Sequence, residues 1–598
     1  MSNLINYLNA QRARSGVWVD NETIAFLSTE SGVPQIWKIN LKDGVPQQVT
    51  DFKERLLVLQ SNPTQKAILF TMDLGGNEQE QIYKIDSSGV VTRLTDDDSA
   101  RHNLGGITND GKRLIMASNG RDKACFDIVS LDLDSMKQEI IIKNDDNYNT
   151  PAALSPDGNY LIYNKLKAES DNCFWMANLK EKVAMQVPKG GSVAKYTSPS
   201  WKSDSKGFYF VTDAENDFSY VGFYDLEKEE TTVVYQDESW GVDSISLSAD
   251  NHYLAINVNR DGYSDLIIYD LVQKVEVNTI KPPMGVAAPY ERTSWSPEGH
   301  VLLFSLTSGK RMQDLWVLDL DQDKLQKITN SSTGGVIMDE LVEPLLMRYT
   351  SFDGLSIPYW LYKPIGKELK DLAIMIDIHG GPEGQELPMY DPITQYLVSQ
   401  DIAVVAPNVR GSTGYGKIYT HLDDKGKRLD SVRDIECLVA HLIETGVADK
   451  KKIAVSGGSY GGFMTLSCAA RYPDLFCCAV DTVGMFNLVT FLENTADYRR
   501  PHRESEYGAL ATDREMLFNV SPIAKVDQIR GPLMVIHGAN DPRVPVSEAE
   551  AVVSYLKEKG VTVEYLRYED EGHGISKIKN RLDCYPKVVK FLKKNMNI

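Results

Sequence analysis

The chain has 598 residues, of which 42% are hydrophobic and 25% charged, and its formal net charge at pH 7 is −19. This length exceeds what one hydrophobic core usually serves, so we expect at least two domains. The negative charge argues against a nucleic-acid partner, which requires a basic surface, and it disfavours binding to anionic membranes.

The distribution of cysteines and apolar residues indicates in which cellular compartment the protein is expected. Seven cysteines are scattered along the chain, and an odd, scattered set does not resemble a disulfide framework. No apolar stretch approaches the roughly 20 residues that a membrane-spanning helix needs. Residues 1–16 are polar and contain no hydrophobic signal core. We therefore expect a cytoplasmic protein without a membrane partner.

Seven similar units follow one another between about residues 17 and 335. Each contains an apolar or aromatic strand that ends in Asp or Asn, and these ends recur every 45–49 residues. A Ser-Pro-Asp-Gly-like turn and another strand precede each end, most clearly at Ser155–Gly158. Such a period with several strands per unit is typical of a β-propeller, and a β-sandwich with accidental regularity is the alternative. The strand ends are Asn40, Asp86, Asp132, Asn178, Asp225, Asp270 and Asp319.

The turn that follows the Asp319 strand resembles a metal loop only superficially. Asp319, Asp321 and Asp323 have the spacing of a calcium loop, but Lys324 stands where glycine is required and Asn330 where the twelfth position requires Glu. Further along, the glycines of 411–416 resemble a phosphate loop, but no Lys-Ser or Lys-Thr pair follows them. We therefore expect neither a metal ion nor an organic cofactor.

A buried-strand pattern at Ile374–Ile378 ends in His379-Gly-Gly-Pro382. A glycine turn after an early strand is where a hydrolase of the α/β class places one backbone donor of its oxyanion hole. The second donor would be the N–H of the residue after the nucleophile, which is Tyr460. We therefore predict Gly381 and Tyr460 as the two donors, and an ordinary tight turn is the alternative for Gly381.

The nucleophile is predicted at Ser459, within Gly457-Gly-Ser-Tyr-Gly-Gly462. The run Ile453–Val455 precedes it as a strand, and residues 463–470 can form a helix. A strand that turns into a helix at a serine is the nucleophile elbow of an α/β-hydrolase. Side chains at the flanking glycine positions would collide with the neighbouring strand and helix. A glycine-rich turn with a solvated serine is the alternative.

An acid and a base follow the serine in the order that this fold uses. Asp541 comes just after the short apolar strand 532–536, and His573 comes just after the strand pattern 561–568. Nine histidines are present, but only His573 lies beyond Asp541. His537 precedes the acid, and we expect it to shape the loop of Asp541. The predicted catalytic triad is therefore Ser459, Asp541 and His573.

These motifs together resemble the prolyl oligopeptidase family of serine peptidases, and most closely its acylaminoacyl-peptidase-like branch. The resemblance rests on the stretches 379–382, 408–416, 457–462, 537–541 and 571–574, and it covers roughly residues 340–598. It implies an all-β seven-bladed propeller in front of an α/β-hydrolase domain. We accordingly expect an N-terminal segment at 1–16, the propeller at 17–335 and the α/β-hydrolase catalytic domain at 336–598.

The resemblance also implies roles for residues outside the triad. Arg543 would donate to a carbonyl of the substrate, with a plain surface arginine as the alternative. Residues 1–16 would form a helix that packs on the hydrolase domain, with a frayed tail as the alternative. Leu4, Ile5 and Leu8 have spacings that would place them on one face of such a helix. A homo-oligomer such as a dimer is a further implication.

Apolar residues near the triad suggest where the substrate side chain would lie. Phe486 and Phe491 follow the nucleophile, and Val544 follows the acid. Together with Tyr460 they could form an apolar pocket for the residue before the scissile bond. The alternative is that Phe486 and Phe491 are core residues of a helix, which periodicity alone does not exclude.

Two absences restrict the substrate. Prolyl oligopeptidases stack a tryptophan on the substrate proline, but the only tryptophan after residue 320 is Trp360, far upstream of Ser459. Dipeptidyl aminopeptidases of the family bind the free substrate amine with acids on a propeller insertion, and no inserted acidic helix is evident here, although acids from separate blades could replace it. We therefore expect cleavage of short peptides with release of N-acylated amino acids. The alternatives are a dipeptidyl aminopeptidase or oligopeptidase, a carboxylesterase, and, against a complete set of site motifs, a binding module with an inert hydrolase domain.

Overall fold

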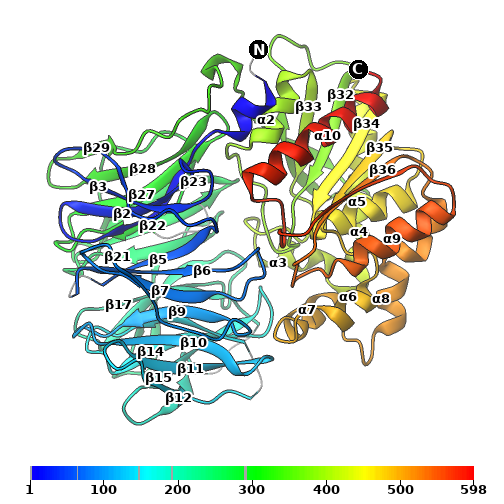
Figure 1. The fold of residues 1–598 in the computed structure, drawn as a ribbon. Coiled ribbons are helices and arrows are strands. Elements are labelled where there is room, and N and C mark those ends of the chain that lie inside the picture. The colour runs from blue at the N-terminus through cyan, green and yellow to red at the C-terminus, as the bar shows by residue number, and fades with distance from the viewer. Residues whose placement is uncertain (1–2, 63–64, 146–147, 190–192, 289–292) are drawn as a thin grey trace.

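The computed structural model describes residues 3–62, 65–145, 148–189, 193–288 and 293–598. It consists of a β-propeller, on the left of Figure 1, that faces an α/β domain on the right. Seven separate antiparallel sheets form the propeller, and one eight-stranded sheet forms the core of the second domain. The predicted fold class, a seven-bladed propeller followed by an α/β-hydrolase domain, is confirmed.

Each blade is built from strands that are consecutive in the chain. The Asp and Asn stations of the sequence lie at or just after the third strand of each blade. Their side chains cap the next turn, as Asp225 does when its carboxylate accepts from the backbone N–H groups of Glu227 and Lys228. The strands of blades one to four are β1 (Ala13–Trp18), β2 (Thr23–Ser28), β3 (Gln35–Asn40), β4 (Gln47–Gln48), β5 (Leu56–Asn62), β6 (Ala67–Met72), β7 (Gln81–Ile85), β8 (Val91–Arg93), β9 (His102–Ile107), β10 (Arg113–Asp122), β11 (Cys125–Asp132), β12 (Gln138–Ile142), β13 (Tyr148–Leu154), β14 (Tyr160–Leu166), β15 (Asn172–Asn178) and β16 (Val183–Gln186).

The seventh blade has a divided inner edge, because β25 and β26 both pair with β27. No strand is shared between the first and last sheets, so side-chain packing joins them within the described ranges. Trp18 of the first blade also donates its indole N–H to the carbonyl of Ser294, at 3.1 Å. The strands of blades five to seven are β17 (Tyr196–Trp201), β18 (Gly207–Thr212), β19 (Tyr220–Asp225), β20 (Glu230–Tyr235), β21 (Val242–Leu247), β22 (Tyr253–Arg260), β23 (Tyr263–Asp270), β24 (Val275–Glu276), β25 (Val286–Ala287), β26 (Ser294–Trp295), β27 (Val301–Ser308), β28 (Arg311–Asp319) and β29 (Lys324–Lys327).

The first blade begins earlier than the sequence indicated. Strand β1 starts at Ala13, so the expected boundary between residues 16 and 17 lies inside this strand. The pairing with β2 shifts register between Arg14 and Val17, and this bulge breaks the alternation by which a strand is detected. Gly16 at the bulge packs on blade seven, where an ideal Cβ would lie 2.9 Å from a methyl of Leu303.

The second domain is a mostly parallel sheet covered by helices on both faces. The strand order is β30-β31-β33-β32-β34-β35-β36-β37, antiparallel up to β33 and parallel from there on. Strands in the middle of such a sheet are apolar throughout, as is β33, in which every residue is buried. The strands are β30 (Leu345–Thr350), β31 (Ser356–Tyr362), β32 (Leu372–Ile378), β33 (Ile402–Pro407), β34 (Ala448–Gly458), β35 (Cys478–Thr482), β36 (Leu533–Gly538) and β37 (Val563–Tyr568).

Two hydrophobic clusters separate the helices by face. One cluster joins α4, α5, α6 and α9 to the sheet, and the other joins α1, α2 and α10 to its opposite face. No helix in the described part of the chain is long and apolar enough to cross a membrane. The helices are α1 (Leu4–Leu8), α2 (Pro392–Ser399), α3 (Lys417–Thr420), α4 (Arg428–Glu444), α5 (Tyr460–Arg471), α6 (Leu488–Asn494), α7 (Arg500–Tyr507), α8 (Arg514–Val520), α9 (Ser547–Glu558) and α10 (Ile578–Met596), and the 3-10 turns are η1 (Met338–Glu340), η2 (His421–Asp423), η3 (Lys425–Lys427) and η4 (Pro522–Gln528).

Helix α1 precedes the propeller in the chain but packs on the α/β domain. It lies there beside α2 and α10, near both chain ends (Figure 1). Leu4, Tyr7 and Leu8 are buried, whereas Ile5 is 44% exposed. The expectation that Ile5 shares the buried face is therefore wrong. Positions i, i+3 and i+4 form one face of a helix, and position 5 lies on its flank. Tyr7 instead packs edge-on against Tyr396 of α2, at 5.5 Å between ring centroids.

Candidate active site

Ser459 lies between the end of β34 and the start of α5, with backbone angles φ 59° and ψ −116°. This is a conformation that residues with a side chain rarely adopt, and its persistence requires support from the surroundings. The Ser459 N–H donates to the carbonyl of Thr482 at 2.9 Å, and its own carbonyl accepts from Phe463 at 3.0 Å. Strand and helix thus hold the serine in the strained turn that the motif predicts.

The flanking glycines are required by close backbone contacts. A Cβ on Gly457 would overlap the carbonyl oxygen of Gly461, and a Cβ on Gly461 would overlap the carbonyl oxygen of Ile378. A Cβ on Gly462 would lie 2.5 Å from a carboxylate oxygen of Asp481. These distances explain why only glycine fits on either side of the serine.

Asp541 and His573 meet at the ends of β36 and β37, with 2.7 Å between the Asp541 Oδ2 and the His573 Nδ1. The other Asp541 oxygen accepts from the backbone N–H groups of Arg543 and Val544, at 2.8 and 3.0 Å. Burial raises the pKa of Asp541, but the imidazole of His573 and these hydrogen bonds outweigh it, so the pKa lies below its usual range. Asp541 is therefore an ionised partner that orients the ring of His573.

His537 is fully buried behind the acid. Its Nε2 lies 2.9 Å from the carbonyl of Val544, to which it donates, and 3.6 Å from Asp541 Oδ2. Burial lowers the pKa of His537, which favours the neutral ring. The position fits the expected role of His537 in shaping the Asp541 loop.

Glu571 is a further residue of the site whose role the sequence did not reveal. It is buried two residues before His573, and its carboxylate accepts from the backbone of Ser576 and Lys577 and from the side chain of Asn580, at 2.8–3.1 Å. These bonds close the loop that carries His573. Glu571 is part of the motif Glu-Gly-His-Gly, but the motif does not show what an acid beside a glycine does in a loop. Only the hydrogen-bond partners of Glu571 in the folded protein show its role.

The loop after β32 lies against the serine. An ideal Cβ on Gly380 would be 3.4 Å from the Cβ of Ser459, so Gly380, which precedes Gly381, adjoins the predicted nucleophile. Gly381 has φ 143°, which favours glycine there. The first residue of α5 is Tyr460, and an amide at this position has no partner within the helix. The two predicted donors thus come from segments that meet at Ser459.

The side chain of Tyr460 lies in the interior. Its hydroxyl donates to Asp423 at 2.9 Å and lies 2.8 Å from the hydroxyl of Ser431. Asp423 also forms an ion pair with the buried Arg428. This side chain therefore anchors the first turn of α5 and does not line a substrate pocket.

The predicted apolar pocket residues lie in the same interior. Phe486, Phe491 and Val544 are 2, 4 and 2% exposed and belong to the cluster that packs α4 to α9 on the sheet. Phe491 contacts the ring of Tyr507 edge-on, at 6.0 Å between centroids. Their burial favours the core alternative that the sequence left open.

Arg543 points to the propeller. Its Nε lies 2.6 Å from the Oε1 of Glu78, which follows β6 in the second blade. Asn540 in the same loop donates to the carbonyl of Gly75, at 3.1 Å. A Cβ on Gly76 would lie 2.6 Å from the amide nitrogen of Gly572, next to His573. The loop at residues 73–80 of blade two thus touches both loops that carry the acid and the base.

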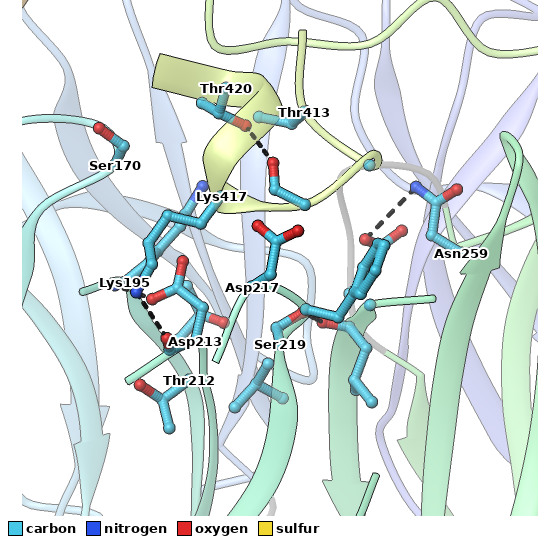
Figure 2. Close-up of a pocket in the computed structure, with 18 of the residues that line it drawn as sticks. Ser170, Lys195, Thr212, Asp213, Asp217, Ser219, Asn259, Thr413, Lys417 and Thr420 are labelled. Atoms are coloured by element: carbon cyan, nitrogen blue, oxygen red, sulfur yellow. Dashed lines mark hydrogen bonds between the residues drawn. The ribbon is translucent and has the colours of Figure 1, made fainter. Parts of the chain in front are cut away.

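A cavity of about 190 Å³ lies between the propeller and the loop that follows Gly381. We call it the acidic cavity, and Figure 2 shows its walls, where the Lys417 ammonium donates to the backbone carbonyl of Asp213 at 2.9 Å. Burial raises the pKa of Asp243 in its wall to about 6. Five carboxylates line the cavity against two lysines, so it has an excess of negative charge. The carboxylates belong to Glu169, Asp213, Asp217, Asp243 and Glu383.

Arg503 of α7 lies between two of these acids. Its guanidinium nitrogens are 3.6 Å from the carboxylates of Glu169 and Glu383. Glu169 comes from blade four and Glu383 from the α/β domain, so this arginine connects the two walls. No group of three or more His, Cys, Asp or Glu side chains in the described ranges is arranged to hold a metal ion.

Comparison with known families and proteins agrees with this architecture. Residues 388–598 match the model of the prolyl oligopeptidase family, and residues 19–202 match the TolB beta propeller domain. Dipeptidyl aminopeptidase BIII of Pseudoxanthomonas mexicana is 26% identical over 96% of this chain and 85% of its own length. The human acylamino-acid-releasing enzyme is 25% identical over 49% of this chain and 40% of its own length.

Solved structures share the whole fold at low identity. A puromycin-hydrolyzing peptidase of Mycobacterium tuberculosis superposes with a TM-score of 0.87 and 18% identity, over 100% of this chain and 96% of that one. The acylaminoacyl peptidase of Pyrococcus horikoshii superposes with a TM-score of 0.75 and 18% identity, over 100% and 97%. The C-terminal part of the chain, residues 388–598, is therefore a prolyl oligopeptidase family domain, and it follows a propeller that matches the TolB beta propeller domain.

Proposed function

We propose that this chain hydrolyses short peptides through an acyl-enzyme on Ser459. The observation that carries the proposal is the pairing of Asp541 with His573 at 2.7 Å, at the ends of β36 and β37 in the same sheet whose strand β34 leads into the strained serine. The buried, ionised carboxylate favours a proton on the Nδ1 of His573, which leaves Nε2 free to accept a proton from Ser459.

In the first step the Ser459 oxygen attacks the scissile carbonyl carbon while its proton moves to His573. The carbonyl oxygen becomes an oxyanion, and the N–H groups of Gly381 and Tyr460 are the proposed donors to it. The intermediate then collapses, the carbon–nitrogen bond breaks, and His573 returns the proton to the leaving amine. The product is an ester between Ser459 and the amino-terminal part of the peptide.

In the second step water attacks this ester, and His573 accepts a proton from the water. The carbon–oxygen bond to Ser459 breaks, the serine recovers its proton, and the amino-terminal product leaves as a carboxylic acid. Because the same steps cleave activated esters, carboxylesterase activity is an alternative that substrate comparison has to test.

For the amino-terminal specificity we favour peptides with a free amino group. The sequence-based expectation of N-acylated substrates rested on the lack of an inserted acidic helix. Acids from separate blades nevertheless line the acidic cavity beside the loop of Gly381, and their excess negative charge suits an ammonium group. The relative that aligns over most of the chain carries the name dipeptidyl aminopeptidase.

Release of N-acylated amino acids is the second candidate. Arg503 lies near Glu169 and Glu383 and reduces the charge available to an amine. Relatives from a plant and from human that align over 33% and 49% of this chain carry the name acylamino-acid-releasing enzyme. This candidate predicts that a blocking acetyl group increases turnover.

One set of substrates tests the function and separates the candidates. A dipeptidyl anilide with a free amine is compared with the same anilide after acetylation, with an acetyl-aminoacyl anilide and with a short acyl ester. We expect the highest kcat/KM for the free amine, and Glu383→Gln should lower it more than it lowers turnover of the acetylated partner. Preference for the acetyl-aminoacyl substrate would establish the second candidate, and turnover of the ester alone would indicate a carboxylesterase. A fluorophosphonate that fails to label Ser459 would overturn the proposed nucleophile.

The expected partners and location remain proposals. Short peptides are the proposed partners, and a homo-oligomer is a proposal from the family resemblance. All seven cysteines lie in the described ranges as free thiols, which suits the reducing environment of the cytoplasm.

A further inference from the structure

A second cavity, of about 680 Å³, lies where the N-terminal segment, the first blade and the start of α10 converge. We call it the arginine cavity. In Figure 1 the N-terminal chain passes between the propeller and the first turns of α10. The wall of the cavity includes Arg12 and Arg14 from the N-terminal segment and Arg581 from α10.

Positive charge predominates in this cavity. Arg55 also lines it but is paired with Asp73, whose carboxylate lies 3.2 Å from the guanidinium. The carboxylates in the wall are those of Glu30 and Asp391, and Asp391 caps α2 by accepting from two backbone N–H groups at its start. Arg12, Arg14 and Arg581 therefore share the wall with two carboxylates, and Arg14 also donates to the hydroxyl of Ser15, in a chain whose net charge is −19.

Two of these arginines form no direct ion pair with a carboxylate within the described ranges. Within the described ranges, the guanidinium groups of Arg12 and Arg581 form no ion pair or hydrogen bond, and the shielded hydroxyl of Tyr390 has no hydrogen-bond partner. The Arg12 side chain is exposed to the cavity. The protein around its guanidinium and the positive charges of Arg581 and Arg14 lower its pKa, and the opposing effects of Asp391 and Tyr390 are smaller. The positive charges of Arg12 and Arg581 repel each other, and an anion bound between them relieves this repulsion.

The arginine cavity adjoins the loop of the base. Ile575 and Ser576 line it, and Ile575 follows His573 by only two residues. Since a residue spans at most about 3.6 Å of chain, the Cα atoms of Ile575 and His573 are within about 7 Å of each other. In the proposed mechanism His573 gives a proton to the leaving amine, so the carboxyl-terminal part of the substrate departs on the side of this loop.

We infer that the arginine cavity binds the C-terminal carboxylate of short peptide substrates, through the guanidinium groups of Arg12 and Arg581. The inference rests on the proposed function, because it places the leaving part of the peptide beside His573. A guanidinium presents a planar fork of N–H donors that matches the two oxygens of a carboxylate. The hydroxyl of Tyr390 supplies a further donor. A peptide whose C-terminal carboxylate is bound there ends inside the cavity, which favours short substrates.

The test compares two peptides that differ only at the C-terminus. One tetrapeptide is used as the free acid and as the C-terminal amide, and kcat and KM for cleavage of the same bond are measured by chromatography. We expect the wild-type protein to show a KM about tenfold lower for the acid, because the amide removes the negative charge. Raising the ionic strength should reduce this difference.

The double variant Arg12→Gln/Arg581→Gln should bring the ratio of the two KM values close to one. Arg530→Gln is the matched control, since Arg530 is a largely exposed surface arginine, and it should keep the wild-type ratio. A general loss of structure would raise both KM values together and lower the melting temperature, so the ratio distinguishes the two effects. If the double variant does not fold, the ratio of the two KM values is measured for each single variant and compared with the wild-type ratio.

The inference is overturned if the wild-type protein cleaves acid and amide with equal KM, or if the double variant keeps the wild-type ratio. Labelling of Ser459 by a fluorophosphonate is measured on the same wild-type preparation. Labelling together with an equal KM for both peptides rejects the carboxylate site and leaves the proposed function intact. Absence of labelling rejects the proposed function itself.

Discussion

Arg543 and Glu78, which are 465 residues apart in the chain, form an ion pair with 2.6 Å between Nε and Oε1. The arginine lies two residues after Asp541, and the glutamate belongs to the second blade of the propeller. The pair therefore joins the loop of Asp541, the proposed catalytic acid, to the other domain. A residue expected to contact the substrate instead contributes at least one of its nitrogens to the domain interface.

Removal of this pair should reduce activity moderately. The Arg543 side chain is 42% exposed and that of Glu78 is 8% exposed, so the pair should contribute about 1 kcal/mol. We expect Glu78→Ala to lower kcat/KM about fivefold, because the Asp541 loop loses a fixed contact. Additive effects of Glu78→Ala and Arg543→Ala on kcat/KM in a double-mutant cycle would contradict the coupling. The control is Lys42→Ala, which removes an exposed ion pair with Glu22 and should leave kcat/KM unchanged.

Ser459→Ala should abolish turnover and leave the fold intact. The hydroxyl oxygen is the atom that forms the acyl-enzyme, and loss of the corresponding serine in subtilisin costs about 10⁶ in kcat. The backbone angles at position 459 are no less favourable for alanine than for serine. The melting temperature of the variant should therefore stay within about 2 °C of the wild-type value. Retention of a tenth of the wild-type activity would show that another residue is the nucleophile.

Asp481 should make the stability of the protein depend on pH. It is fully buried beneath Gly462, and burial raises its pKa to about 7. Because the folded-state pKa exceeds the unfolded value of about 3.9, the contribution of the protonated group is complete below pH 4 and is lost as the pH rises to 7. Asp481→Asn stays neutral, so we expect its stability relative to wild type to increase between pH 5 and pH 8. Denaturant unfolding at both values measures the difference, and a constant difference would contradict the prediction.

Helix α1 offers a matched pair of substitutions. Tyr7 is fully buried against Tyr396, and Ile5 on the same helix is 44% exposed. Tyr7→Ala should lower the free energy of unfolding by about 3–4 kcal/mol, whereas Ile5→Ala should change it by less than about 0.5 kcal/mol. Point substitutions are preferable to deletion of residues 2–14, which would also remove the start of β1. Equal melting temperatures for the two variants would show that α1 adds no stability.

The propeller should restrict substrates by size. The loop at residues 73–80 touches the loops of both Asp541 and His573, so the propeller lies directly over this side of the site. We expect peptides of a few residues to be cleaved and casein-sized chains to resist, which gel electrophoresis and chromatography can follow. A variant with Ser459→Ala serves as the control for contaminating proteases. Rapid digestion of casein by the wild-type protein would contradict the filter.

The fold class and the residues around Ser459 could be predicted without coordinates. The propeller was recognisable because each blade repeats the same local hydrogen bonding, in which an Asp or Asn caps the turn after the third strand. The elbow was recognisable because its glycines are required by close contacts with residues nearby in the chain and with one neighbouring strand. Asp541 and His573 followed from their order after strands. Such features depend on local backbone geometry, which short motifs report.

The contacts of the remaining side chains became apparent only in the folded protein. Burial of Phe486 and Phe491, the pairing of Arg543 with Glu78 and the exposure of Ile5 each depend on segments distant in the chain or on which helix face meets the core. The same holds for the two cavities, whose charged walls come from several blades and from the α/β domain. Periodicity reports the local environment of one segment, whereas the charge of a cavity depends on which segments converge there, and only the folded chain specifies that.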